Sequence, residues 1–308
     1  MLKSEIRKDY ILNRYVIITP SRVNRPRDVR AENQSKRISS CVFCPSNIVT
    51  AEVTDYLLGA VKKQWSCWSV INKYPAVSTN NKSAYGYQEV IVETPQHGID
   101  LGELSEQQMR NVLTLYQKRT KQVSKIKKID YILIFKNSGG KAGASLMHAH
   151  SQLLAMELLP PDVAEELYLA DKASRLCGRS IYRKIIDDEL KQGARIIYQD
   201  DQVVAFAPYA SQFHYEAWIF TRRQVDNIME INSQEMDSMV YCLHLILSKL
   251  HSLNLNYNFF FHQVISNQKQ HFYIKIQPRD SIWAGVELGS GLVINSVAPE
   301  QAAEFYRS

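Results

Sequence analysis

Residues 135–154 of the chain read FKNSGGKAGASLMHAHSQLL, and this stretch decides the fold. Residues 130–136 are rich in apolar and β-branched side chains and predict a buried strand, and residues 148–156 predict a second one. A loop that contains three glycines joins them. Because side chains alternate along a strand, His148, His150 and Gln152 are expected on one face. The stretch therefore predicts two strands that place a polar row beside a glycine-rich loop.

This loop and strand have the composition of a phosphate-binding site. Glycine lets the backbone approach a phosphate closely and point its N–H groups at it, and Asn137 and Ser145 can donate further hydrogen bonds. An imidazole on the neighbouring strand can attack phosphorus at neutral pH. A His-x-His strand alone also fits two histidines that are hydrogen-bonded within the fold, so the motif leaves both interpretations open.

The cysteines point to a metal. Cys41 and Cys44 stand in Cys-Val-Phe-Cys, and His97 closes the stretch Thr-Pro-Gln-His. Two thiolates and two imidazoles make a closed tetrahedral zinc site, so one strand histidine could complete the set while the other acts as nucleophile. A pair of reduced core thiols is the alternative. Cys242 lies in an apolar helical pattern and is interpreted as a core residue.

The order of the predicted elements repeats along the chain. In the first half they are strands at 66–72 and 87–94, a helix at 105–125, and strands at 130–136 and 148–156. In the second half they are strands at 197–206 and 214–221, a helix from 233 to about 252, and strands at 256–264 and 271–277. Short words match as well, such as GYQEVIV at 86–92 and FHYEAWI at 213–219. This similarity indicates an internal duplication with a long period.

We therefore predict an α+β fold made of a duplicated unit, with antiparallel sheets flanked by helices. A length of 308 residues agrees with about two domains, which we place at 1–160 and 161–308. The stretch 160–195 begins with two prolines and continues as a charged helical pattern, so it is interpreted as the connector.

Composition excludes several classes of protein. The net charge of +6 is too small to predict a nucleic-acid binder, and the basic run 118–128 lies on a helix whose other face is apolar. No apolar run approaches the roughly 20 residues of a transmembrane helix, and the first residues lack the apolar core of a signal peptide. We expect a cytoplasmic protein with no nucleic-acid or membrane partner.

Taken together, these motifs resemble the galactose-1-phosphate uridylyltransferases and their relatives in the histidine-triad superfamily. The resemblance covers nearly the whole chain. It rests on residues 135–154 and on Arg22-Val-Asn-Arg-Pro, Cys41-Val-Phe-Cys-Pro, Asn72-Lys-Tyr-Pro-Ala, Thr94-Pro-Gln-His, Ala207-Pro-Tyr-Ala-Ser, Tyr215-Glu-Ala-Trp-Ile and Ala284-Gly-Val-Glu-Leu-Gly-Ser-Gly-Leu-Val-Ile-Asn. The resemblance implies a duplicated histidine-triad fold and a double-displacement reaction. In that reaction a histidine takes a nucleoside monophosphate from a sugar nucleotide and passes it to a phosphate acceptor.

The resemblance also assigns roles to residues of this chain. His150 is similar to the nucleophile, and Gln152 to the residue that hydrogen-bonds the phosphate of the intermediate. Because glutamine cannot act as acid or base, it would not hasten attack by water. The expected ligands of one Zn²⁺ per chain are Cys41, Cys44, His97 and His148. The expected phosphate and nucleotide contacts are Asn137, Gly143, Ser145, Arg22, Arg25 and Asn72.

In the second half, the residues at the positions of the zinc ligands and the nucleophile are Ser180, Arg183, Gln224, His271 and Tyr273. Most of these residues cannot replace their counterparts, so this half is expected to support the fold and line the substrate cleft. Some relatives hold a second metal, for which Glu166, His262 and His271 are the candidate ligands here. Tyr273 stands where such relatives have another ligand, and this leaves the second site open.

The choice of substrate is less specific. The chain has Ala-Ser-Leu-Met before His148, where galactose-specific members have Ser-Asn-Pro, and Ser281 stands where a lysine would hold the sugar phosphate. The stretch 284–295 resembles the ADP-glucose phosphorylase branch, and Glu287 and Asn295 are candidate sugar contacts, with helix or turn polarity as their alternative. The nominal expectation is a UDP-glucose:hexose-1-phosphate uridylyltransferase.

Two alternatives remain. One is a phosphorylase or adenylyltransferase acting on ADP-glucose or dinucleoside polyphosphates, and the other is a non-catalytic, zinc-stabilised nucleotide-binding protein. The expected partners are a nucleotide or nucleotide sugar and a phosphate acceptor. A homodimer is the assembly that the resemblance suggests.

Overall fold

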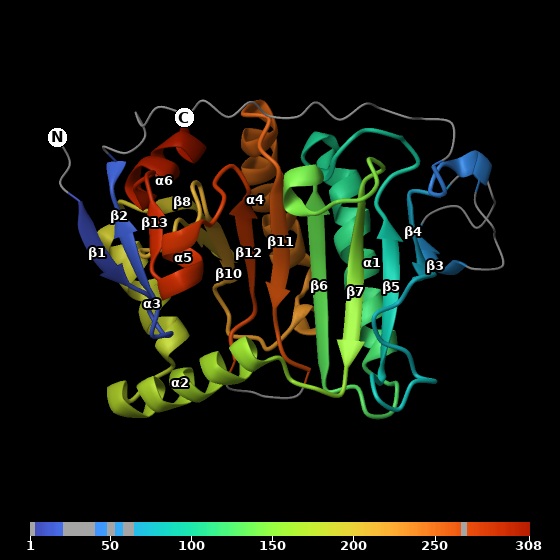
Figure 1. Ribbon diagram of the computed structural model, residues 1–308, viewed down its shortest axis with the longest axis horizontal. Coiled ribbons are helices and arrows are strands. Elements are labelled where there is room, and N and C mark those ends of the chain that lie inside the picture. Colours follow the sequence, from blue (N-terminus) through green and yellow to red (C-terminus); the bar gives the residue numbers. More distant parts are fainter. Residues whose placement is uncertain (1–3, 21–40, 48–52, 58–64, 266–269) are drawn as a thin grey trace.

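The computed structural model describes residues 4–20, 41–47, 53–57, 65–265 and 270–308. Their main feature is one antiparallel sheet of ten strands (Figure 1). In spatial order the strands are β3 (Val53–Leu57), β4 (Cys67–Ile71), β5 (Gly86–Val92), β7 (His150–Met156), β6 (Tyr131–Ser138), β11 (Tyr257–His262), β12 (Tyr273–Pro278), β10 (Ala217–Thr221), β9 (Val203–Phe206) and β8 (Ile196–Gln199). The α+β prediction is confirmed, with the two predicted sheets merged into one.

The strand order is symmetric about the centre of the sheet. Read inward from each edge, β3-β4-β5-β7-β6 corresponds to β8-β9-β10-β12-β11. The two sets meet where β6 pairs with β11, in a register that sets Asn137 opposite Asn258 and Phe135 opposite Phe260. This symmetry agrees with the duplication predicted from the repeated element order.

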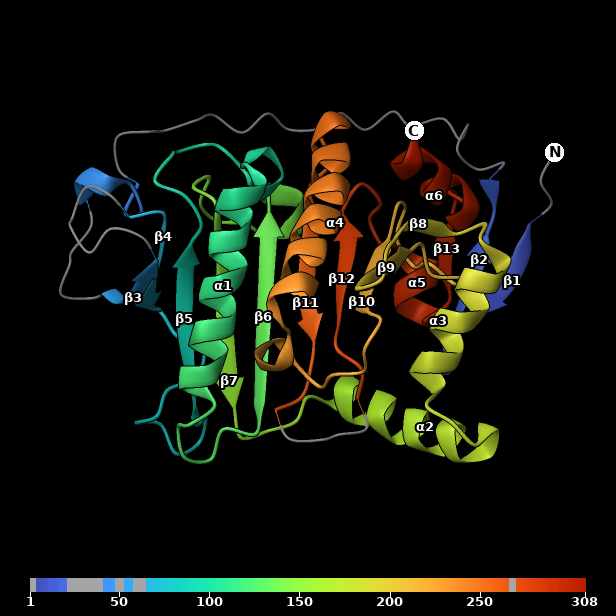
Figure 2. The same cartoon turned by 180° about the vertical axis from the view of Figure 1, so that it is seen from behind.

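Helices α1 (Glu106–Val123) and α4 (Ser233–Ser252) cover one face of the sheet (Figure 2). Each begins at a capping side chain: Ser105 Oγ accepts from the N–H of Gln108, and Asn232 Oδ1 accepts from that of Glu235. Both bury an apolar stripe at helical spacing, which includes Met109, Val112, Leu113 and Tyr116 of α1 and Met239, Val240, Leu243 and Ile246 of α4. Burial of these stripes leaves the opposite face of the sheet to carry the polar rows.

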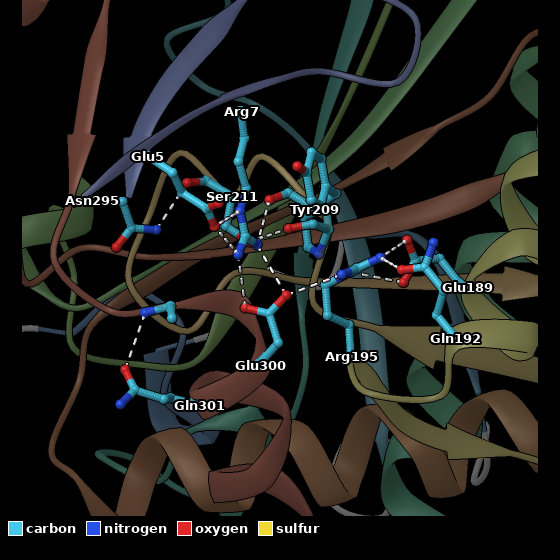
Figure 3. Close-up of polar contacts among 12 residues, drawn as sticks. Glu5, Arg7, Glu189, Gln192, Arg195, Tyr209, Ser211, Asn295, Glu300 and Gln301 are labelled. Atoms are coloured by element: carbon cyan, nitrogen blue, oxygen red, sulfur yellow. Dashed lines mark hydrogen bonds and ion pairs between the residues drawn. The ribbon is translucent and has the colours of Figure 1, made fainter. Parts of the chain in front are cut away.

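A small sheet joins the two ends of the described chain. Strand β1 (Glu5–Lys8) pairs with β2 (Tyr15–Ile18), and β2 pairs in parallel with β13 (Val293–Asn295). Figure 3 shows how Arg7 and Arg195 both reach the carboxylate of Glu300, on α6 (Pro299–Arg307), at 3.0 Å each. Residues 5–18 therefore pack with elements of the second half. Although they precede residue 160 in the sequence, they contact β13 and α6.

The connector is helical, as predicted, and forms α2 (Pro161–Cys177) and α3 (Ile181–Gln192). The predicted single strand at 197–206 is wrong in one respect, because β8 and β9 are two strands joined by a tight turn. Asp200 Oδ1 accepts from the N–H groups of Gln202 and Val203, and this Asx turn reverses the chain. None of the helices in the described residues is both long and apolar enough to cross a bilayer.

Candidate active site and metal centre

Two cysteines and two histidines converge near the end of β5 and the beginning of β7. One ligand atom from each of Cys41, Cys44, His97 and His148 lies within 4.8 Å of all the others. His97 Nδ1 is 3.4 Å from Cys44 Sγ, and His148 Nδ1 is 3.7 Å from both sulfurs. A tetrahedral ion with bonds of about 2.0 to 2.3 Å requires ligand atoms about 3.3 to 3.8 Å apart. The cluster therefore fits a metal ion.

Neighbouring backbone groups fix the tautomer of His148 and the conformation of the loop that carries the cysteines. His148 Nε2 lies 2.7 Å from the carbonyl oxygen of Thr94, so Nε2 carries the proton and Nδ1 is left with a lone pair toward the sulfurs. Burial lowers the pKa of His148, although its hydrogen bond to Thr94 opposes this, and the ring stays neutral. The loop after Cys41 is closed by Asn47, whose side chain donates to the Cys41 carbonyl at 2.8 Å.

His150 begins strand β7 two residues after His148 and is buried. Its Nδ1 lies 2.8 Å from the carbonyl oxygen of His148, which makes Nδ1 the protonated nitrogen and leaves the lone pair on Nε2. Burial lowers the pKa of His150 to about 4; the hydrogen bond to His148 opposes this shift, and the charge of Lys136 adds to it. The imidazole is thus neutral at pH 7 and can act as a nucleophile.

Beside His150 lies a cavity of about 220 Å³, lined by residues of the glycine-rich loop together with Asn137, Ser145 and His150. Gly139 has φ +80° and a Cβ there would lie 2.4 Å from the Asn256 side chain, so only glycine fits. Asn258 Nδ2 donates to Asn137 Oδ1 at 2.8 Å, and this turns the Asn137 NH₂ group toward Gly143. The cavity therefore gathers hydrogen-bond donors around His150.

Gln152 follows on the same face of β7 and is held by two neighbours. Its Oε1 accepts from Gln88 Nε2 at 2.9 Å and from Asn72 Nδ2 at 3.4 Å. With the oxygen occupied in this way, the NH₂ group of Gln152 is the part left to donate to a ligand. The structure thus brings Asn72 to Gln152, on the side of β7 away from β6.

Comparison with known proteins agrees with this geometry. Residues 1–160 match the family model for the galactose-1-phosphate uridyl transferase N-terminal domain, and residues 91–305 match a model for a domain of unknown function. The chain is 30% identical to an ADP-glucose phosphorylase of Arabidopsis thaliana over 98% of its own length and 92% of the relative's.

The chain belongs to the galactose-1-phosphate uridylyltransferase family.

A second relative and one solved structure show the range of this family. A galactose-1-phosphate uridylyltransferase of Thermotoga maritima is 26% identical over 98% of both chains. The crystal structure of an ADP-glucose phosphorylase of Arabidopsis thaliana with bound ADP-glucose superposes with a TM-score of 0.86 at 28% identity, and covers 100% of this chain and 99% of the other. As a member of this family, the chain is an enzyme of the nucleotidyltransferase class.

Not every site residue predicted from the sequence lies at the cavity beside His150 in the described part of this uridylyltransferase-family chain. Arg22 and Arg25 lie outside the described residues. Glu287, on the short helix α5 (Gly285–Ser290), accepts from the N–H of Ala284 at 2.9 Å and so caps its own helix. Asn295 is fully buried, and its NH₂ group donates to the carbonyl of Ser211 (Figure 3). It also donates to the carbonyl of Phe213. The predicted sugar contact at Asn295 is therefore not supported.

The second metal site considered for this family is not formed among the described residues. Glu166 is buried and contacts one of the two candidate histidines, His262, whose Nε2 lies 3.0 Å away; the hydroxyls of Tyr273 and Tyr182 lie 2.8 and 3.1 Å from the same carboxylate. His271 instead donates through Nε2 to the Thr221 carbonyl at 2.7 Å. Two of the three candidate ligands are thus in contact, but among the described residues they form no metal-binding cluster with His271.

Lys136, which lies next to His150, was not singled out from the sequence. Lys136 is in β6, its ammonium group is 3.5 Å from the carbonyl oxygen of His150, and it is 1% exposed. The available signal was its position in the run Ile-Leu-Ile-Phe-Lys, where alternation places a cation on the buried face of the strand.

Proposed function

We propose that the chain transfers a nucleoside monophosphate from a nucleotide sugar to a phosphate acceptor through a covalent adduct on His150. In the first step, Nε2 attacks the α-phosphorus; an N–P bond forms, the bond from phosphorus to the leaving oxygen breaks, and a hexose 1-phosphate departs. In the second step, an oxygen of the acceptor phosphate attacks, and the N–P bond breaks. No proton needs to leave Nδ1 in either step.

The hydrogen bond from His150 Nδ1 to the His148 carbonyl carries this proposal. It selects the tautomer with a free lone pair at Nε2, and it stabilises the positive charge that the ring acquires in the adduct. The Asn137 amide, the Ser145 hydroxyl and the loop N–H groups are the donors that would hold the phosphate oxygens. Gln152 contributes a neutral donor and no base, which favours a phosphate acceptor over water.

We further propose that the metal of the Cys₂His₂ cluster is a single zinc ion. A cysteine-rich tetrahedral set with no open position is typical of structural zinc. Zinc bound there would hold the His148 ring in place, and His148 in turn supplies the carbonyl that orients His150. The role of the cluster is thus to position the nucleophile.

ADP-glucose with inorganic phosphate is the substrate pair that we favour. The 30% identical relative is an ADP-glucose phosphorylase, and Ser281 provides no cation for a second sugar phosphate. UDP-glucose with a hexose 1-phosphate is the second candidate, supported by the match of residues 1–160 to the uridyl transferase model and by the relative of Thermotoga maritima. Arg22, Arg25 and Asn72 remain our proposed contacts for the nucleotide.

Intact-mass measurement tests the covalent step. The protein is incubated without acceptor, in parallel with ADP-glucose and with UDP-glucose. A mass gain of one nucleoside monophosphate is expected in the wild type and in His244→Ala, which removes a histidine of α4. His150→Ala should form no adduct and lose at least about a thousandfold in transfer rate.

Addition of acceptor to the isolated adduct then decides between the substrate pairs. We expect inorganic phosphate to discharge an adenylyl adduct and release ADP. Discharge by a hexose 1-phosphate alone would favour the uridylyltransferase instead. If neither donor gives an adduct that depends on His150, the covalent mechanism is wrong for these donors.

A further inference from the structure

A buried cluster of charges lies beneath the strand that carries His150. The Lys136 ammonium is 2.6 Å from Glu93 Oε2, 2.9 Å from Asp100 Oδ1 and 3.5 Å from the carbonyl oxygen of His150. Lys136 and Glu93 are 1% and 0% exposed. An ammonium group has three N–H bonds, and these three oxygens account for all of them. Lys136 therefore has no donor left for a ligand.

Lys136 lies at the point in the sheet where β6 stops pairing with β7. Strand β7 lies between β5 and β6, and its pairing with β6 ends at Ser151 opposite Lys136. His150 is thus the first residue of β7 without a backbone partner on the β6 side. The Lys136 side chain continues from that point and passes under β7 to Glu93, which follows β5. One ammonium group therefore connects three adjacent strands where the nucleophile stands.

The cluster is built to keep its charge. Burial alone would lower the pKa of Lys136, but Asp100 and Glu93 outweigh it and raise this pKa above its usual value. Asp100 also accepts from Ser138 at 2.9 Å and from Tyr257 at 2.5 Å. The Tyr116 hydroxyl of α1 lies 3.1 Å from Glu93 and 2.7 Å from the Ser151 hydroxyl. These contacts tie the ion pair to both the helix layer and β7.

Stability alone does not account for such an arrangement. A buried ion pair is often no more stabilising than apolar side chains of similar volume, and its best-attested use is to select one arrangement of the chain. Here the arrangement selected is that of residues 148–151, which supply the nucleophile and the carbonyl that orients it.

We propose that Lys136 is a positioning residue of the transfer reaction, which holds the end of β7 so that His150 Nε2 faces the phosphate loop. This inference rests on the proposed function of His150. Lys136 borders the cavity beside His150, but its three N–H bonds go to Glu93, Asp100 and the His150 carbonyl rather than to a ligand. Its loss should therefore slow the chemical step and leave donor binding nearly unchanged.

The test compares two variants with the wild type. Lys136→Met leaves the buried carboxylate of Glu93 close to the partly buried one of Asp100 and risks misfolding, so the main variant is Lys136→Met with Glu93→Gln, which removes both charges of the buried pair. The matched control is Lys118→Met. It removes a lysine of α1 that forms an ion pair with Asp55 of β3, away from His150. Metal content and thermal unfolding show whether each variant is folded.

Single-turnover adduct formation is then measured as a function of donor concentration. We expect the double variant to bind its metal, to keep the donor KM within about twofold, and to form the adduct at least about tenfold more slowly. Lys118→Met should match the wild type. Adduct formation by the double variant at the wild-type rate would overturn the inference, as would a change confined to KM. If the wild type itself forms no adduct, the proposed function fails and this inference fails with it.

Discussion

The two halves of the sheet hold an equivalent histidine in different surroundings. His148 lies just before β7 and His271 just before β12, and each donates through Nε2 to a threonine carbonyl, of Thr94 and Thr221, at the same distance of 2.7 Å. The Nδ1 of His148 faces two sulfurs. The Nδ1 of His271 is buried with no hydrogen-bond partner among the described residues, as is the hydroxyl oxygen of Ser180, where the first half has Cys41.

The strand positions that follow differ as well. His150 and Gln152 of the first half correspond to Tyr273 and Lys275 of the second. The Tyr273 hydroxyl donates to Glu166 at 2.8 Å, and the Lys275 ammonium lies 3.6 Å from the same carboxylate. Both groups are thus occupied by an internal partner, whereas His150 Nε2 faces a cavity. The comparison teaches that both halves keep the histidine-to-carbonyl bond, whereas only the first half has the Cys₂His₂ cluster and the histidine that we propose as the nucleophile.

Replacement of each equivalent histidine should give the largest contrast. His148→Ala removes a metal ligand, so we expect most of the bound metal to be lost and unfolding to become easier by roughly 5 kcal/mol or more. His271→Ala removes one buried hydrogen bond, at about 1 to 3 kcal/mol, and should keep the metal. Metal analysis and urea unfolding of both variants check this. Equal metal loss in the two would contradict the division of roles.

The pH dependence of stability offers a second, smaller contrast. Burial lowers the pKa of His271 to about 4, against about 6.5 in the unfolded chain. Between these values the unfolded chain binds the proton more tightly, so the stability of the fold falls as pH drops from about 6.5 to 4. His271 alone contributes a loss on the order of 3 kcal/mol. The loss should be absent in His271→Gln.

Urea unfolding of wild type and His271→Gln at pH 7 and pH 4.5 measures this difference. Both proteins contain the same Cys₂His₂ cluster, so any loss of its proposed metal at low pH would affect them equally and cancel. Parallel pH profiles would show that His271 takes up its proton at an ordinary pKa.

The smallest effect is expected for Lys275→Gln, which gives the second half the glutamine that the first half has at the equivalent position, Gln152. Lys275→Gln breaks the 3.6 Å contact with Glu166 and the contact with the Trp218 ring, whose centroid is 4.9 Å away. His262, Tyr182 and Tyr273 still bind Glu166, so we expect a loss of about 1 kcal/mol or less. The rate of adduct formation should not change. A markedly slower rate would give the second half a part in the chemistry.

Much of this comparison could be predicted from the sequence, because local patterns carry it. The capping side chains, the apolar stripes of α1 and α4, and the alternation along β7 are all short-range features. The spacing of Cys41 and Cys44, with His97 and one of the two strand histidines, likewise predicted a metal cluster, and the family resemblance selected His148 as the fourth ligand; the geometry of these four residues fits a metal. The joining of two sheets into one could not be predicted, since the pairing of β6 with β11 is a contact between distant segments that no local pattern marks.

The role of single polar residues was harder to predict. Asn295 and Asn137 are the same residue type in similar glycine-containing stretches. One is fully buried and bonded to two carbonyls, and the other turns its NH₂ group to a cavity. Only the burial of each side chain separates the two cases. Lys136 was overlooked for a related reason: a cation in an apolar strand has meaning once its carboxylate partners are known.

The pairing of β2 with β13 has a consequence for how the protein is made. A ribosome releases residues 15–18 long before residues 293–295, yet these strands are neighbours in the small sheet. The pairing of β2 with β13 must therefore wait until the strands of both halves of the large sheet have been made, while the strands of the first half can already associate. The parallel pairing in the small sheet is thus a late step of folding during synthesis.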